Sequence, residues 1–136
     1  MLDCLILGDS IAVGTHQFKQ ECVAYAKGGI NSRQYYQKYV LPRQNDFGAE
    51  VVIISLGSND WDGIKTYNEL YKLRERVKAE RVYWVLPNAE KFPRQEHDVN
   101  LIAISFGDFV IKPNRYQKDQ VHPSWAGYKE IAQEAE

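Results

Sequence analysis

The chain has 136 residues, of which 44% are hydrophobic and 26% charged, the balance of one ordinary globular domain and not of a disordered chain. Its 17 basic and 18 acidic residues give a net charge of −1, so it lacks the positive excess usual in nucleic-acid-binding proteins. No apolar run approaches the roughly 20 residues that span a bilayer. We therefore expect a single domain over residues 1–136, with neither nucleic acid nor a membrane as partner.

Five short apolar segments, each followed by turn-forming residues, predict five β-strands. They are rich in β-branched and aromatic residues and are too short for typical helices. Their apolar character is almost continuous, which is typical of strands that are covered on both faces of a parallel sheet. In chain order the predicted strands are Leu2–Leu7, Cys22–Ala26, Val51–Leu56, Arg81–Leu86 and Phe109–Ile111.

The segments between these strands carry apolar residues at helical spacing, which predicts helices that pack on the sheet. Ser10–Lys19 and Ser124–Glu134 are the expected first and last helices. Thr66 and Glu69 predict a capping box at the start of the third helix, and Gly107 predicts a left-handed end to the fourth. The three remaining apolar stripes are Tyr35, Tyr36, Tyr39 and Val40, then Leu70, Leu73 and Val77, then Val99, Ile102, Ala103 and Phe106.

A strand and a helix thus alternate five times along the chain. This order predicts an α/β fold, a three-layer α/β/α sandwich whose five-stranded parallel sheet has right-handed crossovers. Ligands of such sheets bind at the carboxyl ends of the strands, near the switch in strand order. We therefore expect the functional residues to lie directly after the strands.

Three of these strand ends carry residues that suit catalysis. Ser10 follows the first strand, where it is either a helix cap or a nucleophile beside free backbone N–H groups. Gly28 and Gly29 follow the second strand, and glycine lets a backbone amide approach a ligand closely. Asn59 follows the third strand, where its side chain either forms a local turn or donates a hydrogen bond into the same crevice.

His122 lies on a loop near the C-terminus, because the proline that follows it disfavours helical geometry. Asp119 is placed to accept a hydrogen bond from the imidazole and to fix the tautomer that acts as a base. Each residue alone is compatible with an ordinary surface position. Together with Ser10 they fill the roles of an acyl-transfer site. The N–H groups of Ser10 and Gly29 and the side chain of Asn59 are the expected oxyanion-hole donors.

These residues lie in four blocks that resemble those of the SGNH (or GDSL) hydrolases and stand in that family's order. The blocks are Gly8-Asp9-Ser10, Gly29-Ile30-Asn31-Ser32, Gly57-Ser58-Asn59-Asp60 and Asp119-Gln120-Val121-His122-Pro123. The Gly-x-Ser-x-Gly motif of the α/β-hydrolases is absent, because position 12 is Ala12. The resemblance implies a flavodoxin-like sandwich, ester hydrolysis without metal or cofactor, and Ser10, Gly29, Asn59 and His122 as the residues that name the family.

The expected substrate is a small-molecule or carbohydrate ester with a short acyl group, such as acetyl. A chain of this length has no room for insertions that would build a deep pocket. Trp61 and Trp125 each follow one of the blocks, where they either stack on a sugar ring or cover the core. A non-catalytic module that binds a glycan or another ligand on the same fold is the alternative. The three histidines lack metal-ligand spacing, so no metal is expected.

Cys4 and Cys22 are expected to be reduced thiols in the core, because two cysteines do not make a disulfide framework. The N-terminal segment MLDCLILGDS lacks the basic lead-in and the long apolar run of a signal peptide. Both observations lead us to expect a cytoplasmic protein. The sequence carries no signal for a particular oligomeric state.

Overall fold

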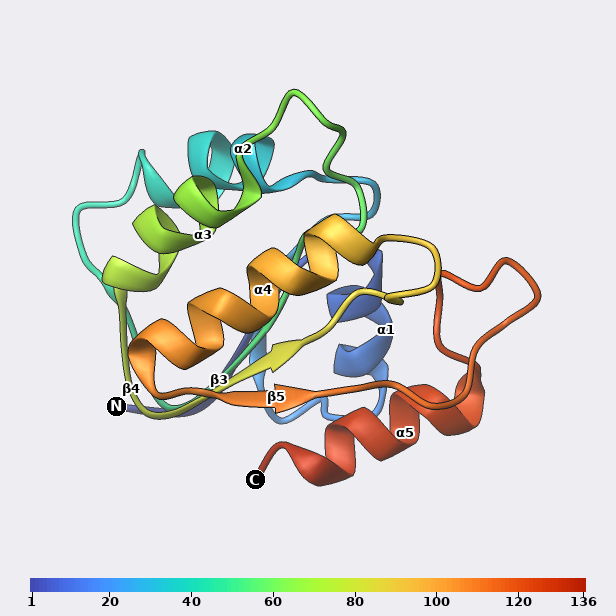
Figure 1. Cartoon of the computed structure of the whole chain (residues 1–136). Coiled ribbons are helices and arrows are strands. Elements are labelled where there is room, and N and C mark those ends of the chain that lie inside the picture. Colours follow the sequence, from blue (N-terminus) through green and yellow to red (C-terminus); the bar gives the residue numbers. More distant parts are fainter.

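The structure is a computed structural model that describes all 136 residues, and its centre is a sheet of five parallel strands (Figure 1). The strand order is β2-β1-β3-β4-β5, so the chain leaves β1 in one direction for β2 and returns on its other side for β3. The predicted α/β class and parallel sheet are confirmed, and this is the flavodoxin-like order. The strands are β1 (Leu2–Gly8), β2 (Val23–Ala26), β3 (Phe47–Ser55), β4 (Val77–Val85) and β5 (Phe109–Ile111).

Helices cover both faces of this sheet. One core cluster joins the sheet to α1 and α5, and a larger one joins it to α2, α3 and α4 (Figure 1). The last helix, α5, begins after the loop that carries His122 and ends near the amino ends of the strands. The helical segments are α1 (Ser10–Gln17), α2 (Ser32–Tyr35), a π-helical turn η1 (Tyr36–Val40), α3 (Thr66–Glu75), α4 (Pro93–Phe106) and α5 (Trp125–Glu134).

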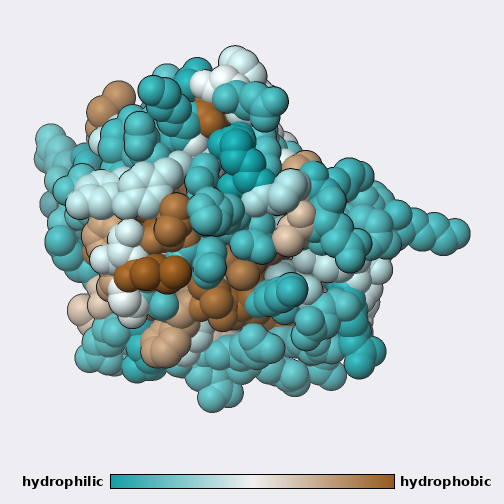
Figure 2. Space-filling view, viewed as in Figure 1, coloured by the Kyte–Doolittle hydropathy of each residue, from teal (hydrophilic) through white to brown (hydrophobic).

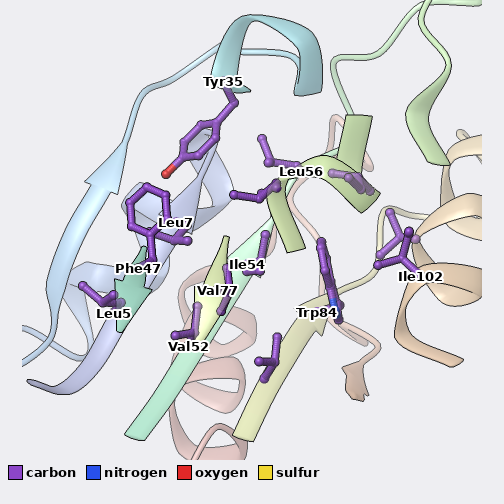
Figure 3. Close-up of a cluster of buried hydrophobic side chains, with 14 of the residues drawn as sticks. Leu5, Leu7, Tyr35, Phe47, Val52, Ile54, Leu56, Val77, Trp84 and Ile102 are labelled. Atoms are coloured by element: carbon purple, nitrogen blue, oxygen red, sulfur yellow. The ribbon is translucent and has the colours of Figure 1, made fainter. Parts of the chain in front are cut away.

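Alternation along the strands divides the core between the two faces. Leu7 belongs to the larger cluster and Ile6 to the smaller one, because successive side chains of a strand point to opposite faces. Figure 3 shows the larger cluster, in which Tyr35 reaches from α2 toward Leu7. The Tyr35 hydroxyl donates a hydrogen bond to the backbone oxygen of Tyr25 at 2.6 Å. This bond fixes α2 over the carboxyl ends of β1 and β2, where the functional residues were expected.

Two strands begin earlier than their sequence patterns indicate. β3 begins at Phe47 and β4 at Val77, and these two residues are partners in the parallel register. Val77 was expected to belong to the apolar stripe of α3, but that helix ends at Glu75. The prediction was wrong because pairing between neighbouring strands overrides the local helical spacing.

The capping box predicted at Thr66 is also absent. Thr66 is the first helical residue, and its hydroxyl donates to the carboxylate of Asp60 at 2.7 Å instead of capping the helix. A capping box does occur at the start of α2, where the Asn31 side chain accepts the N–H of Gln34 and the Gln34 side chain accepts the N–H of Asn31. The buried carboxylate of Asp60, six residues earlier in the chain, therefore takes the hydroxyl that the predicted capping box required.

Cys4 and Cys22 form a disulfide, so the expectation of two reduced thiols is wrong. The cause is the register of the sheet: Leu5 pairs with Val23, which brings the residue before each of them side by side. Disulfides are typical of proteins in oxidising compartments. The cysteines therefore give no support to the expectation of a cytoplasmic protein.

The surface is polar over most of the face shown in Figure 2, but apolar side chains gather over α4 and β5. No helix of the structure has both the length and the apolar character that crossing a membrane requires. The exposed large apolar residues of α4 and β5 are Leu101, Ile104, Phe109 and Val110.

Candidate active site

Ser10 is the first residue of α1 and follows directly on the carboxyl end of β1. The preceding residue, Asp9, is extended and caps the helix, because its carboxylate accepts the N–H of Ile11 at 3.0 Å. The Ser10 hydroxyl donates a hydrogen bond to Nε2 of His122 at 2.8 Å, although the two residues are 112 positions apart. The fold therefore brings the expected nucleophile and the expected base into direct contact.

The other imidazole nitrogen of His122 donates to the carboxylate of Asp119 at 2.6 Å. The same carboxylate accepts the backbone N–H groups of Val121 at 2.9 Å and His122 at 3.0 Å. These hydrogen bonds, with the one from the imidazole first, hold the pKa of the Asp119 carboxyl well below its usual range. Asp119 is therefore ionised across the physiological pH range, and its hydrogen bond orients the imidazole with Nε2 toward Ser10.

Two residues that sequence reasoning missed hold the loop that carries Asp119 and His122. The Asn88 side chain donates to the backbone oxygen of Gln120 at 2.8 Å, and Nζ of Lys91 donates to the backbone oxygen of Asp119 at 3.0 Å. Gln120 has a φ of 59°, a left-handed conformation that few residues other than glycine adopt. Asn88 and Lys91 follow the carboxyl end of β4, and this position directly after a strand is the sequence signal that could have identified them.

The glycine turn after β2 lies against the nucleophile. A Cβ placed on Gly28 would be 3.8 Å from the Cβ of Ser10. Gly29 has a φ of +79°, and a Cβ there would meet nothing within 4 Å, so backbone conformation and not space calls for glycine. Neither the N–H of Gly29 nor that of Ser10 donates to another backbone group. Both are free to bind a ligand.

Asn59 and Asp60 join the turn after β3 to the turn after β2. The Asn59 amide donates to the backbone oxygen of Ile30 at 3.0 Å, and this exposed side chain forms no second hydrogen bond within the protein. The buried carboxylate of Asp60 accepts the N–H of Ser32 at 2.8 Å and the hydroxyl of Thr66. Asp60 thus fixes the start of α2 relative to α3. Sequence reasoning placed Asp60 in a motif without assigning it this role.

Asp9 is buried directly behind Ser10. One carboxylate oxygen accepts the hydroxyl of Ser55 at 3.1 Å as well as the capping N–H, which ties the turn after β1 to the end of β3. The other oxygen, Oδ2, has no hydrogen-bond partner. Burial raises the pKa of Asp9 to about 6. Asp9 therefore supports the turn that carries Ser10.

Trp61 and Trp125 do not cover the core, because their exposed fractions are 62% and 76%. Trp125 is the first residue of α5 and packs edge-to-face on Phe18, with ring centroids 4.9 Å apart. Trp61 lies on the loop after β3 with its ring over Gly63. Both side chains are thus accessible, one at each of the two blocks that they follow.

The contacts form one chain of proton donors and acceptors from Asp119 through His122 to Ser10. A base that accepts the serine proton makes the hydroxyl a nucleophile, and a carboxylate on the far nitrogen stabilises the resulting imidazolium. The arrangement is suited to acyl transfer. No cluster of three or more His, Cys, Asp or Glu side chains that could hold a metal ion lies in the structure.

Three solved structures resemble the chain over almost its whole length. A protein from Bacteroides fragilis assigned as an acylhydrolase has a TM-score of 0.66 and 16% identity, over 97% of this chain and 83% of that one. A protein from Desulfitobacterium hafniense assigned to the G-D-S-L family of lipolytic proteins has a TM-score of 0.59 and 12% identity, over 98% and 97%.

The third structure is the C-terminal catalytic domain of peptidoglycan O-acetyltransferase A from Streptococcus pneumoniae, with a methylsulfonyl adduct. It has a TM-score of 0.62 and 16% identity, over 98% of this chain and 96% of that one. No protein-family model matches the chain, and no curated protein matches it. At this level of identity, the three similarities establish a shared fold.

Proposed function

Since the chain has the fold of the SGNH/GDSL hydrolases, we propose that it is a serine esterase that cleaves short-chain acyl esters through an acyl-enzyme at Ser10. The observation that supports this most strongly is the pair of hydrogen bonds that joins Ser10, His122 and Asp119. A structural scaffold has no need of such a chain at the carboxyl ends of its strands.

In the proposed reaction, Ser10 Oγ attacks the ester carbonyl while Nε2 of His122 takes its proton. The tetrahedral intermediate then collapses, and His122 returns the proton to the departing alcohol. Water attacks the acyl-enzyme with the same base and releases the acid and the free serine. Asp119 remains ionised throughout and stabilises the imidazolium.

Three donors are proposed to stabilise the negative oxygen of the intermediate. Two are the N–H groups of Ser10 and Gly29, which no backbone acceptor occupies. The third is the Asn59 amide, whose other N–H is held by Ile30. Losing one such donor typically lowers the rate by about 10²–10³.

We favour a short acyl group, such as acetyl, on a carbohydrate. The site is open, since the side chains of His122 and Asp119 are 34% and 45% exposed, and water can therefore resolve the acyl-enzyme. The exposed indoles of Trp61 and Trp125 offer flat surfaces for sugar rings. Acetyl transfer to a second alcohol would use the same intermediate, and one structural neighbour is an O-acetyltransferase domain.

The decisive experiment compares wild type with Ser10→Ala on 4-nitrophenyl acetate. We expect the variant to show only background hydrolysis, because it retains no nucleophile. Ser105→Ala is the matched control, since that serine lies exposed on α4 and should leave the rate unchanged. Equal rates for wild type and Ser10→Ala would contradict the proposal, and a strong preference for long-chain esters would contradict the short acyl group.

A non-catalytic glycan-binding module on the same fold is the second candidate, which the exposed indoles favour. It would keep the crevice but have no need of an activated serine. A fluorophosphonate probe distinguishes the two, because it labels only a serine whose proton a base accepts. Rapid labelling of wild type at Ser10, with none in Ser10→Ala, would support the esterase.

A further inference from the structure

A cavity of about 520 Å³ opens beside the glycine turn that carries one of the proposed oxyanion donors. Its walls are the turn after β2, residues 27–30, and three residues of the helical segment that follows, Gln34, Gln37 and Lys38. Ile30 is the only apolar residue among them. The cavity has the size of pockets that hold small-molecule ligands, and it is far larger than an acetyl group requires.

This cavity adjoins the proposed nucleophile. Gly28 forms part of its wall, and a Cβ on Gly28 would touch the Cβ of Ser10 at 3.8 Å. Gly29, whose N–H is free, forms the adjacent part. An ester whose carbonyl lies between Ser10 and Gly29 therefore has this cavity next to it, available for a part of the substrate that does not react.

The lining is positively charged and contains no carboxylate. Lys27 and Lys38 both line the cavity, and neither forms an ion pair, while Lys38 Nζ lies 5.6 Å from the Tyr39 ring. The surrounding stretch, residues 22–45, has four basic residues and no acidic one, although the whole chain carries a net charge of −1. Positive charge is thus concentrated on the wall beside the proposed active site.

The remaining side chains of the lining suit hydroxyl groups. Gln34 uses its carbonyl oxygen in the capping box of α2, which leaves its NH₂ group free to donate. Gln37 is exposed, and its amide has no hydrogen-bond partner in the protein. Such a wall disfavours a long alkyl chain, because burying these amides and ammonium groups against methylenes would leave them without partners.

We propose that this cavity binds a sugar ring that carries a negative charge, with Lys27 and Lys38 pairing with the anion and the two glutamines contacting hydroxyl groups. The inference rests on the proposed esterase function and specifies its substrate as an acyl ester of an acidic carbohydrate. A sugar carboxylate and a sugar phosphate both have this chemistry, since ammonium groups bind either anion.

The test measures binding to Ser10→Ala protein, so its result does not depend on turnover. Backbone amide shifts are followed by NMR during titration with two pairs of probes: trigalacturonate and its methyl ester, and glucose 6-phosphate and glucose. We expect shifts in residues 27–38 and a Kd at least about fivefold lower for the anion of one pair, because two exposed lysines each contribute modestly. The pair with the larger difference identifies the anion as carboxylate or phosphate.

A Lys27→Gln/Lys38→Gln double variant should lose this difference in Kd. Lys78→Gln is the matched control and should keep the difference, since Lys78 is exposed near the amino end of β4, whereas the cavity lies after the carboxyl end of β2. Equal Kd values within both pairs, shifts confined to other regions, or a preference that survives in the double variant would overturn the inference. Failure of the esterase itself is a separate result, seen as Ser10-independent hydrolysis.

Discussion

The residues around Ser10 are of two kinds: some belong to the proposed active site, and others are buried and support the turn that carries Ser10. Asp9 is of the second kind, because its carboxyl is buried and joins the start of α1 to Ser55 on β3. Its second oxygen finds no partner, so the charged form is poorly solvated and its pKa rises to about 6. The turn thus gains an anchor between two strands at a cost in stability that depends on pH.

This cost predicts a pH-dependent effect of Asp9→Asn. Because the folded-state pKa of about 6 exceeds the ordinary value of 3.8, the folded protein binds more protons than the unfolded chain between these values. Its contribution to stability therefore falls as pH rises from about 4 to 6 and is constant above that. Asn does not titrate, so the free energy of unfolding of the variant, relative to wild type, should rise by about 2–3 kcal/mol from pH 4 to pH 7.

Urea unfolding at the two pH values measures this difference. Asp62→Asn is the control, because the Asp62 side chain is fully exposed and should show no such change. The explanation fails if Asp9→Asn differs from wild type by the same amount at both pH values.

At the scale of elements, the contact between α1 and α5 determines whether serine and histidine meet. α1 begins with Ser10, and α5 begins three residues after His122. The two helices approach closely at Gly14, where a Cβ would collide with the Tyr128 ring. α5 also packs against the loop before it, since a Cβ on Gly127 would collide with the backbone oxygen of Arg115. Small residues thus allow the two ends of the chain to converge.

Gly14→Ala should therefore destabilise the protein, although alanine is the better helix former by about 1 kcal/mol. We expect a net loss of about 1–3 kcal/mol, because the added methyl displaces the Tyr128 ring and shifts α1 against α5. In a Tyr128→Leu background the same substitution should cost clearly less. Chemical denaturation of the four proteins measures the coupling, and an equal effect of Gly14→Ala in both backgrounds would refute the close contact.

At the scale of the whole molecule, the sheet is held on both faces by helices and is linked covalently at one edge. The disulfide between Cys4 and Cys22 joins β1 to the residue before the edge strand β2 and encloses α1. Both cysteines lie within the smaller core cluster. The strand that leads into the glycine turn is thus fixed to the strand that leads into Ser10.

Reduction of this disulfide should lower the free energy of unfolding by about 3 kcal/mol, because the bond closes a loop with a sequence separation of 18 and restricts the unfolded chain. Denaturation with and without a phosphine reductant measures the effect in wild type. A Cys4→Ala/Cys22→Ala variant should be insensitive to the reductant. Identical stability of the oxidised and the fully reduced wild type would show that the bond contributes nothing.

The sequence by itself determined the alternation of strands and helices. It also determined that Ser10 follows the first strand and that His122 lies on the loop before the last helix. These features depend on interactions within a few residues, so local spacing encodes them. Examples are the apolar runs, the turn-forming residues and the left-handed helix end at Gly107. Only the tertiary structure decided that Val77 starts a strand and that Thr66 bonds to the buried carboxylate of Asp60. It alone also joined the two cysteines and brought the Ser10 hydroxyl to Nε2 of His122. The physical reason is that these contacts depend on strand register and on the packing of elements against one another, which no local pattern records.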